Sequence, residues 1–297
     1  MRLLTVPNWS FGRDVGLSRL FAETLEFRPL RVHYLKSDVD HNRTVTAFSG
    51  HPDVVFETVL TLAEFAFDRI DLNRHVGVHP RIGALDVCPF VALPGWNGPP
   101  ETGRLLSEIE AFGDTLAHRY HLPVFLYEKS ERGRHEADLP SLRKGGFGGL
   151  LDRDLRPDFG PTRAHPRLGV TVVGLREFLI ALNVNLQGTD ARVAQQIARE
   201  IRTARSEGDL RFVGVRALGF YLSTAEVAQV SMNLTLPDLT AVDAIVEWVG
   251  KRAFELGTRA VGNELIGVIR SRDLPHAESL EINPHQIVDG AFGDAPV

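Results

Sequence analysis

Residues 178–186, FLIALNVNL, end in an alternation of aliphatic and amide side chains. Successive side chains of a β-strand point to opposite faces, so Asn183 and Asn185 would lie on the face opposite the aliphatic residues. The aliphatic residues are Ile180, Leu182, Val184 and Leu186. The stretch therefore predicts a strand that buries one face of a sheet and leaves the other face polar.

Residues 227–235, VAQVSMNLT, repeat this alternation, with Gln229, Ser231 and Asn233 on one face. Asparagine is poor in strands, so two strands that carry rows of amides need an explanation. One explanation is a polar sheet face that contacts a ligand. The other is an ordinary solvent-facing sheet surface, and the pattern alone allows both.

The segments around these strands predict a repeated order of elements. Hydrophobic periodicity predicts strand, helix, strand, strand, helix and strand over residues 178–269, including a strand at 211–218. Residues 2–93 show the same order, with a strong helix signal at 51–70. This βαββαβ order is the split βαβ, or ferredoxin-like, unit.

We therefore predict an α/β (α+β) fold of two ferredoxin-like subdomains, with the sheets facing each other and the helices outside. The predicted domains are residues 1–175 and 176–297. Thr189 is the expected N-cap of a helix at 190–205. Residues 128–169 are rich in Gly, Pro, Arg and Asp, and this composition predicts loops around a short helix.

Composition limits the class of protein. The chain has 297 residues, 43% of them hydrophobic, and a formal net charge of −5, which argues against a nucleic-acid-binding surface. The single cysteine, Cys88, excludes an intramolecular disulfide and a thiolate zinc cluster. No stretch approaches the roughly 18 apolar residues of a membrane span, and no signal peptide is recognisable, so we expect a cytoplasmic protein without a membrane partner.

The densest group of chemically useful side chains is in residues 75–90, HVGVHPRIGALDVCPF. His79 precedes a buried strand, and Asp86 interrupts the apolar run of that strand. A rigid loop entering a strand suits catalysis, and a buried carboxylate needs a partner. For Asp86 the alternative to a catalytic role is a structural ion pair with Arg81 or Arg74.

A metal site is a weaker interpretation of the histidines. His75 and His79 are four residues apart, which is ligand spacing only on a helix, and Gly77 and Pro80 disfavour a helix there. A site that also uses His41 stays an alternative. We expect no metal.

A second polar group lies in residues 38–50, DVDHNRTVTAFSG, and a third in residues 6–12, VPNWSFG. Aspartate and asparagine also favour tight turns, which is the structural interpretation of the second group. With four further segments, these groups resemble the glutamate formimidoyltransferase family, the formiminotransferase part of formimidoyltransferase-cyclodeaminase. The further segments are IDLNRHVGVHPRIGALDVCPF (70–90), PDFGPTRAHPRLGVTVVGLREFLIALNVNLQGT (157–189), AQVSMNL (228–234) and VGNELIGV (261–268).

The resemblance implies two ferredoxin-like subdomains with a folate channel between them. It also implies that the histidine of the HPR triplet, His79, is the catalytic acid–base. The family's folate-contacting stretch matches ten consecutive residues here, to which we add Asn183 and Asn233 from the amide rows. The ten residues are Gly160, Pro161, Thr162, Arg163, Ala164, His165, Pro166, Arg167, Leu168 and Gly169.

The family reaction moves a formimino group from N-formimino-L-glutamate to N5 of tetrahydrofolate, the co-substrate, and releases glutamate. Asp86 or Asp40 would face the cationic amidine, and Arg43 and Arg81 would hold carboxylates in two-point hydrogen bonds. Asn42 is a further expected contact of this substrate. The expected partners are these small molecules, with self-association a possibility.

Two positions depart from the family pattern. Family members usually carry glutamate where this chain has Phe11 and Val78. Two alternatives follow: a related folate transferase that moves a formyl group or uses another donor, and a folate-binding protein without catalysis.

Overall fold

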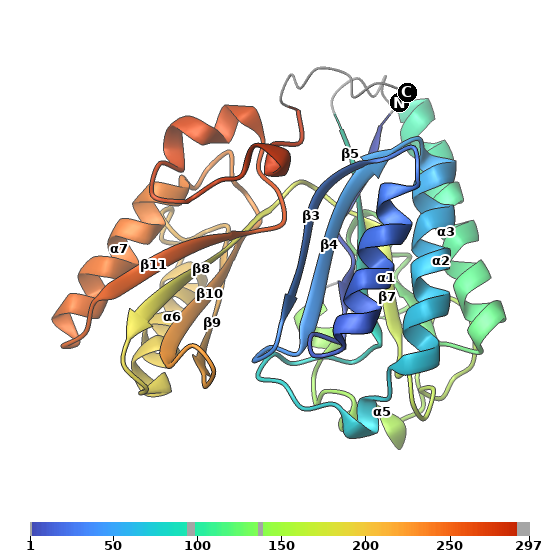
Figure 1. Cartoon of the computed structure of the whole chain (residues 1–297), viewed down its shortest axis with the longest axis horizontal. Helices are drawn as coiled ribbons and strands as arrows, with labels where there is room; N and C mark the ends of the chain where they lie inside the picture. Colours follow the sequence, from blue (N-terminus) through green and yellow to red (C-terminus); the bar gives the residue numbers. More distant parts are fainter. Residues whose placement is uncertain (1, 94–98, 136–138, 290–297) are drawn as a thin grey trace. The chain divides into compact units, whose positions relative to one another are not determined.

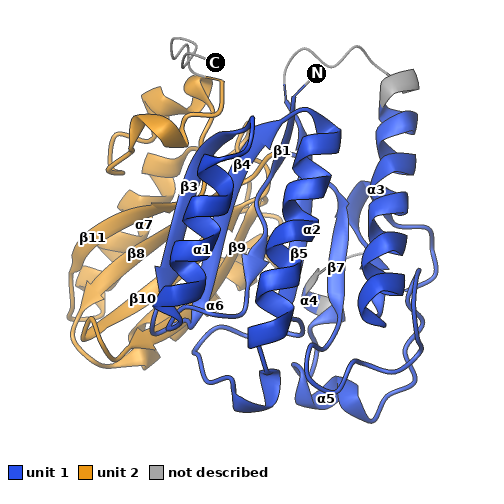
Figure 2. Ribbon diagram, turned by 45° about the vertical axis from the view of Figure 1, so that its right-hand side comes forward, with its two compact units in different colours: residues 1–177 blue, residues 178–297 orange. Residues whose placement is uncertain are grey.

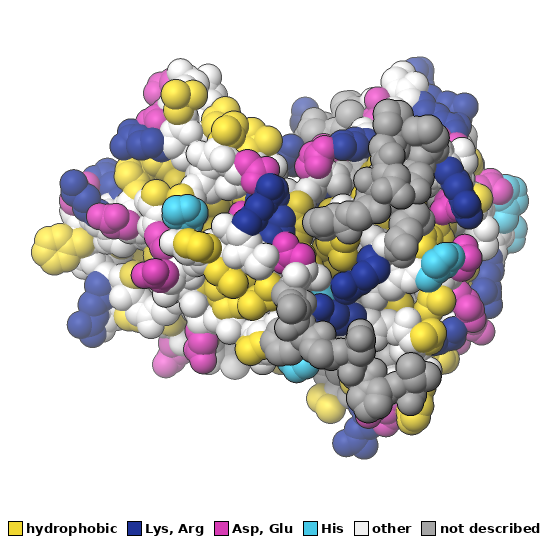
Figure 3. Space-filling view, turned by 90° about the horizontal axis from the view of Figure 1, so that it is seen from above, with side chains coloured by type: hydrophobic (Ala, Val, Ile, Leu, Met, Phe, Trp, Pro, Cys, Tyr) yellow, Lys and Arg dark blue, Asp and Glu magenta, His cyan; other side chains and the backbone are white. Residues whose placement is uncertain are grey.

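A computed structural model describes residues 2–93, 99–135 and 139–289. The chain forms two compact units, Met1–Glu177 and Phe178–Val297, shown in two colours in Figure 2. Within the described residues, every helix is too short or too polar to cross a bilayer. On the surface seen in Figure 3, basic and acidic side chains are interspersed.

The sheet of unit 1 begins with a strand interrupted at Pro7. The two pieces on either side of Pro7 both pair antiparallel with β4 and with β5, so they occupy one position in the sheet. Proline lacks the N–H that a ladder needs, which explains the break. The strands of this sheet are β1 (Leu3–Thr5), β2 (Asn8–Trp9), β3 (Arg31–Asp38), β4 (Arg43–Gly50), β5 (Leu85–Ala92), β6 (Val124–Leu126) and β7 (Thr171–Leu175).

Three long helices cover one face of this sheet, as Figure 2 shows. They are α1 (Val15–Glu26), α2 (Pro52–Arg69) and α3 (Pro99–Tyr120). Their buried side chains, such as Phe21 and Leu62, pack with Trp9 and Phe90 of the strands. The order predicted for residues 2–93 is confirmed, apart from the interruption of the first strand.

Residues 128–170 cover part of the other face, and the prediction of loops around one short helix was incomplete there. Two short α-helices, α4 (Leu139–Leu142) and α5 (Gly148–Leu151), lie in this segment, together with η2 (Glu128–Ser130). Apolar side chains of the segment form a second core with residues such as Phe125. The segment ends at β7, a strand that the sequence analysis missed and that pairs parallel with both β5 and β6.

Unit 2 is a four-stranded antiparallel sheet with two helices (Figure 1). The order predicted for residues 178–269 is confirmed, and the strands lie in the order β11-β8-β10-β9. The elements are β8 (Ile180–Gln187), α6 (Ala191–Ser206), β9 (Val215–Leu222), β10 (Val227–Leu234), α7 (Val242–Glu255) and β11 (Ala260–Ile266), followed by η3 (Ser271–His276) and η4 (Pro284–Gln286).

Two local predictions in unit 2 were wrong. The N-cap of α6 is Asp190, not Thr189, because the Asp190 carboxylate accepts the backbone N–H of Arg192 at 2.9 Å. The strand predicted at 211–218 begins four residues later, because Asp209 and Phe212 form a turn whose backbone hydrogen bond is 2.9 Å long.

The alternation in β8 and β10 is confirmed. Leu182 and Met232 are almost fully buried and pair across the strands, whereas Asn183 pairs with Ser231 on the opposite face. Unit 2 therefore carries a row of polar side chains along two central strands, as the pattern predicted.

Candidate active site

Three loops of unit 1 approach one another at the ends of β2, β3 and η1 (Leu72–Arg74). The contacts are so close that side chains are excluded. A Cβ at Gly12 would lie 2.0 Å from the carbonyl oxygen of Asp38, and one at Gly77 would lie 2.2 Å from that of His41. Glycine at both positions therefore lets the three backbones meet.

Asn42 ties the three loops together. Its Oδ1 accepts the backbone N–H of Gly12 at 2.8 Å, and its Nδ2 donates to the carbonyl of Val76 at 3.1 Å. Nδ2 also lies 3.3 Å from Nδ1 of His75, and since Nδ2 can only donate, that ring nitrogen accepts. Asn42 adopts a φ of 46°, a conformation that asparagine tolerates. Its amide serves the loop structure, and a substrate contact there stays a prediction.

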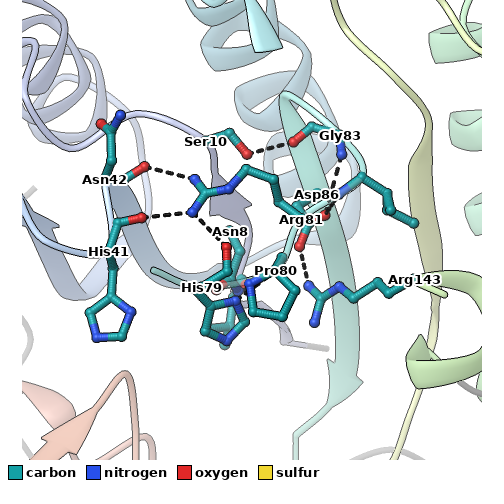
Figure 4. A network of polar contacts seen from close by, with 12 residues as sticks. Asn8, Ser10, His41, Asn42, His79, Pro80, Arg81, Gly83, Asp86 and Arg143 are labelled. Carbon is teal, nitrogen blue, oxygen red and sulfur yellow. Dashed lines mark hydrogen bonds and ion pairs between the residues drawn. The ribbon is translucent and has the colours of Figure 1, made fainter. Parts of the chain in front are cut away.

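Arg81 fixes the loop that carries His79 (Figure 4). Its guanidinium donates to the carbonyls of His41 at 2.7 Å, Asn42 at 3.0 Å and His79 at 2.7 Å. Burial, followed by smaller effects of neighbouring charges, lowers the pKa of Arg81 to about 10, so the side chain remains charged at neutral pH. The two terminal nitrogens that we expected to hold a substrate carboxylate are thus engaged with backbone oxygens.

The His79 ring has a defined orientation. Its Nδ1 lies 2.9 Å from the carbonyl oxygen of Pro80, and a carbonyl can only accept, so Nδ1 carries a hydrogen. The lone pair of the neutral ring is therefore on Nε2. Burial, and then the positive charges of Arg43 and Arg143, hold the pKa of His79 well below its usual 6.5. The ring of His41 is close, with its centroid 5.9 Å away. Neutral His79 is thus poised as a base at physiological pH.

Asp86 is 5% exposed and fully engaged. Its Oδ1 accepts the backbone N–H groups of Ile82 at 2.7 Å and Gly83 at 3.3 Å, which shapes the turn after His79. Its Oδ2 forms an ion pair with the guanidinium of Arg143. Asp86 therefore stabilises the turn that follows His79.

Arg143 is the residue that sequence reasoning missed. We considered Arg81 and Arg74 as structural partners for Asp86, but the partner is Arg143, 57 residues along the chain. It follows α4 in the weakly patterned segment, where no periodicity drew attention to it. Only the need of a buried carboxylate for a cation could have suggested such a partner.

Arg43 and Asp40 lie in the loop and strand beside this pair. Burial, and then the charge of Arg143, lower the pKa of Arg43, while Asp38, its neighbour across the β3–β4 ladder, opposes that change. Asp40 is 8% exposed, and its backbone carbonyl accepts the N–H of Val78 at 3.2 Å. Arginines 43, 81 and 143 thus give the surroundings of His79 a positive character.

The predicted folate stretch, residues 160–169, borders this region. The backbone of Leu168 accepts the N–H of Ala84 at 2.9 Å, and Gly169 bridges to Gly83. Arg163 is exposed and pairs with Asp154 at 3.1 Å. The stretch is therefore attached to the turn that Asp86 organises.

The end of this stretch is a tight turn packed on the loop after α2. His165 Nδ1 accepts the backbone N–H groups of Arg167 at 3.1 Å and Leu168 at 3.0 Å. The guanidinium of Arg167 donates to the carbonyl of Phe67, so this side chain has a structural contact. Asn73 donates to the carbonyl of Pro166 at 2.8 Å and anchors the turn from outside.

The two predicted folate residues of unit 2 differ in exposure. Asn183 is 4% exposed, and its amide lies 3.5 Å from the carboxylate of Glu264. Asn233 is exposed on the same sheet face. Next to them Gln229 donates to Asn185 at 2.9 Å, so part of the amide row satisfies itself.

The two positions that depart from the family pattern have different surroundings. The Phe11 ring is 5% exposed and packs edge-on against Phe21, with centroids 5.0 Å apart. Val78 is 41% exposed at the loop surface. Within residues 2–93, 99–135 and 139–289, no three His, Cys, Asp or Glu side chains are grouped to hold a metal ion.

The chain matches two family models over most of its length. Residues 2–176 match the N-terminal subdomain of the formiminotransferase domain, and residues 181–287 match the formiminotransferase domain. It is 37% identical over 274 residues to formimidoyltransferase-cyclodeaminase of Sus scrofa, covering 89% of this chain and 49% of that protein. The chain thus spans about half the length of such relatives.

A shorter relative is matched over nearly its whole length. Glutamate formimidoyltransferase of Streptococcus pyogenes serotype M1 is 32% identical over 274 residues, covering 91% of this chain and 89% of that protein. With a neutral histidine held in the loop of the HPR triplet of unit 1 and family matches in both units, this chain belongs to the formiminotransferase domain family.

Proposed function

We propose that this protein transfers the formimino group of N-formimino-L-glutamate to N5 of tetrahydrofolate and releases L-glutamate. The family membership and the name of the bacterial relative support this activity. The observation that carries the mechanism is the fixed tautomer of His79, whose Nδ1–H is held by the carbonyl of Pro80 at 2.9 Å.

His79 moves one proton between two nitrogens. N5 of tetrahydrofolate attacks the amidine carbon, forming the new C–N bond and a tetrahedral centre. Nε2 of His79 takes the surplus proton from N5 and then gives it to the glutamate nitrogen as the old C–N bond breaks. Such transfers typically contribute about 10²–10⁴-fold to a rate.

The arginines around His79 link proton transfer to binding of the donor. Burial, and then Arg43 and Arg143, disfavour the imidazolium form of His79. Formimino-glutamate carries two carboxylates, and pairing them with Arg43 and its neighbours offsets that positive charge. His79 therefore becomes a better proton acceptor when the donor is bound. Asp40, in the loop before Arg43, is the carboxylate proposed to face the amidine. The carboxylate of Asp86 forms an ion pair with Arg143.

The folate is held by residues 160–169 and by the amide row that includes Asn183 and Asn233. The first stretch is attached to the turn after His79, and the row offers neutral donors and acceptors suited to a pterin ring. Each unit contains the βαββαβ order, so we describe them as two ferredoxin-like subdomains, with catalysis in residues 1–175 and folate contacts shared with 176–297. The predicted facing of the two sheets, a cytoplasmic location and self-association stay predictions.

A spectroscopic assay for transfer to tetrahydrofolate tests this function. Purified protein is given formimino-glutamate or formyl-glutamate, with the His79→Ala variant as the matched control. We expect transfer from formimino-glutamate that the variant loses. Faster turnover of formyl-glutamate would identify a different donor, and folate binding without any transfer would identify a binding protein. Phe11 and Val78, which replace the usual family glutamates, are the reason to include these two arms.

A further inference from the structure

A cavity of about 390 Å³ lies in unit 1, on the face of the sheet that residues 128–170 cover. Its volume is in the range typical of small-molecule sites, roughly 300–1,000 Å³. It is lined by Ile82, Phe125, Arg134, His135, Leu142, Leu150, Arg153, Asp154, Leu155, Arg156 and Val170.

The walls of the cavity are apolar. Phe125, Leu150 and Val170 belong to the second core of unit 1 and are almost fully buried. The only polar group that the structure buries in this wall is His135, whose Nε2 lies 2.8 Å from the Asp158 carboxylate. Since Nε2 of His135 is engaged with Asp158, the interior favours an apolar ligand body.

The rim of the cavity is positive. Three arginines, Arg134, Arg153 and Arg156, face one aspartate, Asp154, which gives a formal charge of 3 − 1 = +2 with histidine neutral. Asp154 is also paired with Arg163 at 3.1 Å, which adds a further positive neighbour. Within the described part of the chain, Arg156 makes no hydrogen bond or ion pair. Such a rim selects an anion.

We propose that this cavity binds a small amphipathic anion: a carboxylate or sulfonate carried on an aromatic or aliphatic body. The body fills the apolar interior and the acid group pairs with Arg153 and Arg156. This site is separate from the transfer chemistry assigned to His79 and does not depend on that assignment.

The position of the cavity gives the ligand access to the catalytic loop. Ile82 lines it and donates its backbone N–H to Asp86. Leu142 lines it too and directly precedes Arg143, the partner of Asp86. A bound ligand therefore contacts residues adjoining both members of the ion pair beside His79, so its binding is expected to restrain that pair.

Fluorescence titration with 8-anilinonaphthalene-1-sulfonate, an amphipathic anion, tests the proposal on the intact folded protein. We expect saturable binding at one site, weakened about tenfold in Arg153→Gln and again in Arg156→Gln, because each variant loses a charge-assisted hydrogen bond to the acid group. Tenfold corresponds to about 1.4 kcal/mol. The matched control is Arg211→Gln, which alters an exposed arginine of unit 2 that pairs with Asp209. Circular dichroism establishes that each variant is folded.

Three results would overturn the site. They are probe binding without saturation, equal affinity in the Arg153→Gln, Arg156→Gln and Arg211→Gln variants, and equally tight binding of the uncharged analogue N-phenyl-1-naphthylamine. Competition then identifies the source of the ligand. Displacement by p-aminobenzoyl-glutamate assigns the cavity to the tail of folate, and displacement only by unrelated aryl carboxylates assigns it to a separate effector. None of these measurements depends on formimino transfer. They therefore test the cavity even if the protein lacks that activity.

Discussion

The loops around His79 in unit 1 and the amide row of unit 2 are both polar, but they are built differently. Around His79 the polar groups are charged, buried and fixed by bonds between loops, as Arg81 and Asp86 show. Along β8 and β10 the groups are neutral and stand on a regular ladder, as Asn183 does. Fixed charges suit proton transfer, whereas neutral amides suit recognition of a ring by hydrogen bonds. In the function proposed above, unit 1 carries the chemistry and unit 2 orients the folate.

The largest expected effect tests whether charges hold unit 1 together. Asp86→Ala leaves Arg143 without its partner in a site where that side chain is 17% exposed, and we expect unfolding free energy to fall by about 3 kcal/mol. Urea denaturation measures this. The control is Glu64→Ala, which breaks an exposed pair with Arg119 and is expected to cost less than about 1 kcal/mol. Equal losses of unfolding free energy in the two variants would contradict the structural role of Asp86.

The next effect tests the chemistry of unit 1. His79→Ala is expected to lower kcat at least about a hundredfold, because it removes the proton shuttle. Affinity for 5-formyl-tetrahydrofolate, measured by titration, should change little. His118→Ala, on an exposed face of α3, is the matched control. A variant at position 79 that retains its turnover would refute the shuttle.

A smaller effect tests orientation by unit 2. Asn183→Ala is expected to raise the KM for tetrahydrofolate up to about tenfold with kcat nearly unchanged, since one hydrogen bond is worth roughly 0.5–1.5 kcal/mol. Gln196→Ala on α6 serves as the control, because its amide bonds only Glu200 on the same helix. A fall in kcat at constant KM would place Asn183 with the chemistry instead.

The smallest effect concerns pH. Burial, and then the charge of Arg81, lower the pKa of His75 to about 4. Between pH 6.5 and pH 4 the unfolded chain binds a proton at this residue that the folded chain does not, so stability falls as the pH falls. The slope stays well below the roughly 1.4 kcal/mol per pH unit of a fully buried group, because solvent screens the half-buried ring of His75. Urea melts at several pH values should show a shallower slope for His75→Gln, and an unchanged slope would contradict the shift.

Periodicity predicted most of the fold because it reflects local rules. The βαββαβ orders and the two faces of β8 and β10 follow from alternation and helical spacing alone. β7 and the second core were missed, because a buried five-residue strand after a glycine- and arginine-rich segment carries little pattern. Of the site, the sequence predicted the groups of residues but not their contacts. The sequence does not reveal that Arg81 donates to backbone carbonyls or that Arg143 pairs with Asp86. Both contacts join residues far apart in the chain, so they depend on the tertiary fold.

The three hydrogen bonds that Arg81 donates have a consequence for how the site can evolve. All three of its acceptors are main-chain oxygens, which every amino acid supplies. Exchanging the side chain at position 41 or 79 therefore leaves the acceptors of Arg81 in place, whereas the amide of Asn42 is itself needed to join the loops. New chemistry can be tried on this frame one side chain at a time, while loss of the single guanidinium would remove three of the hydrogen bonds that fix the loop.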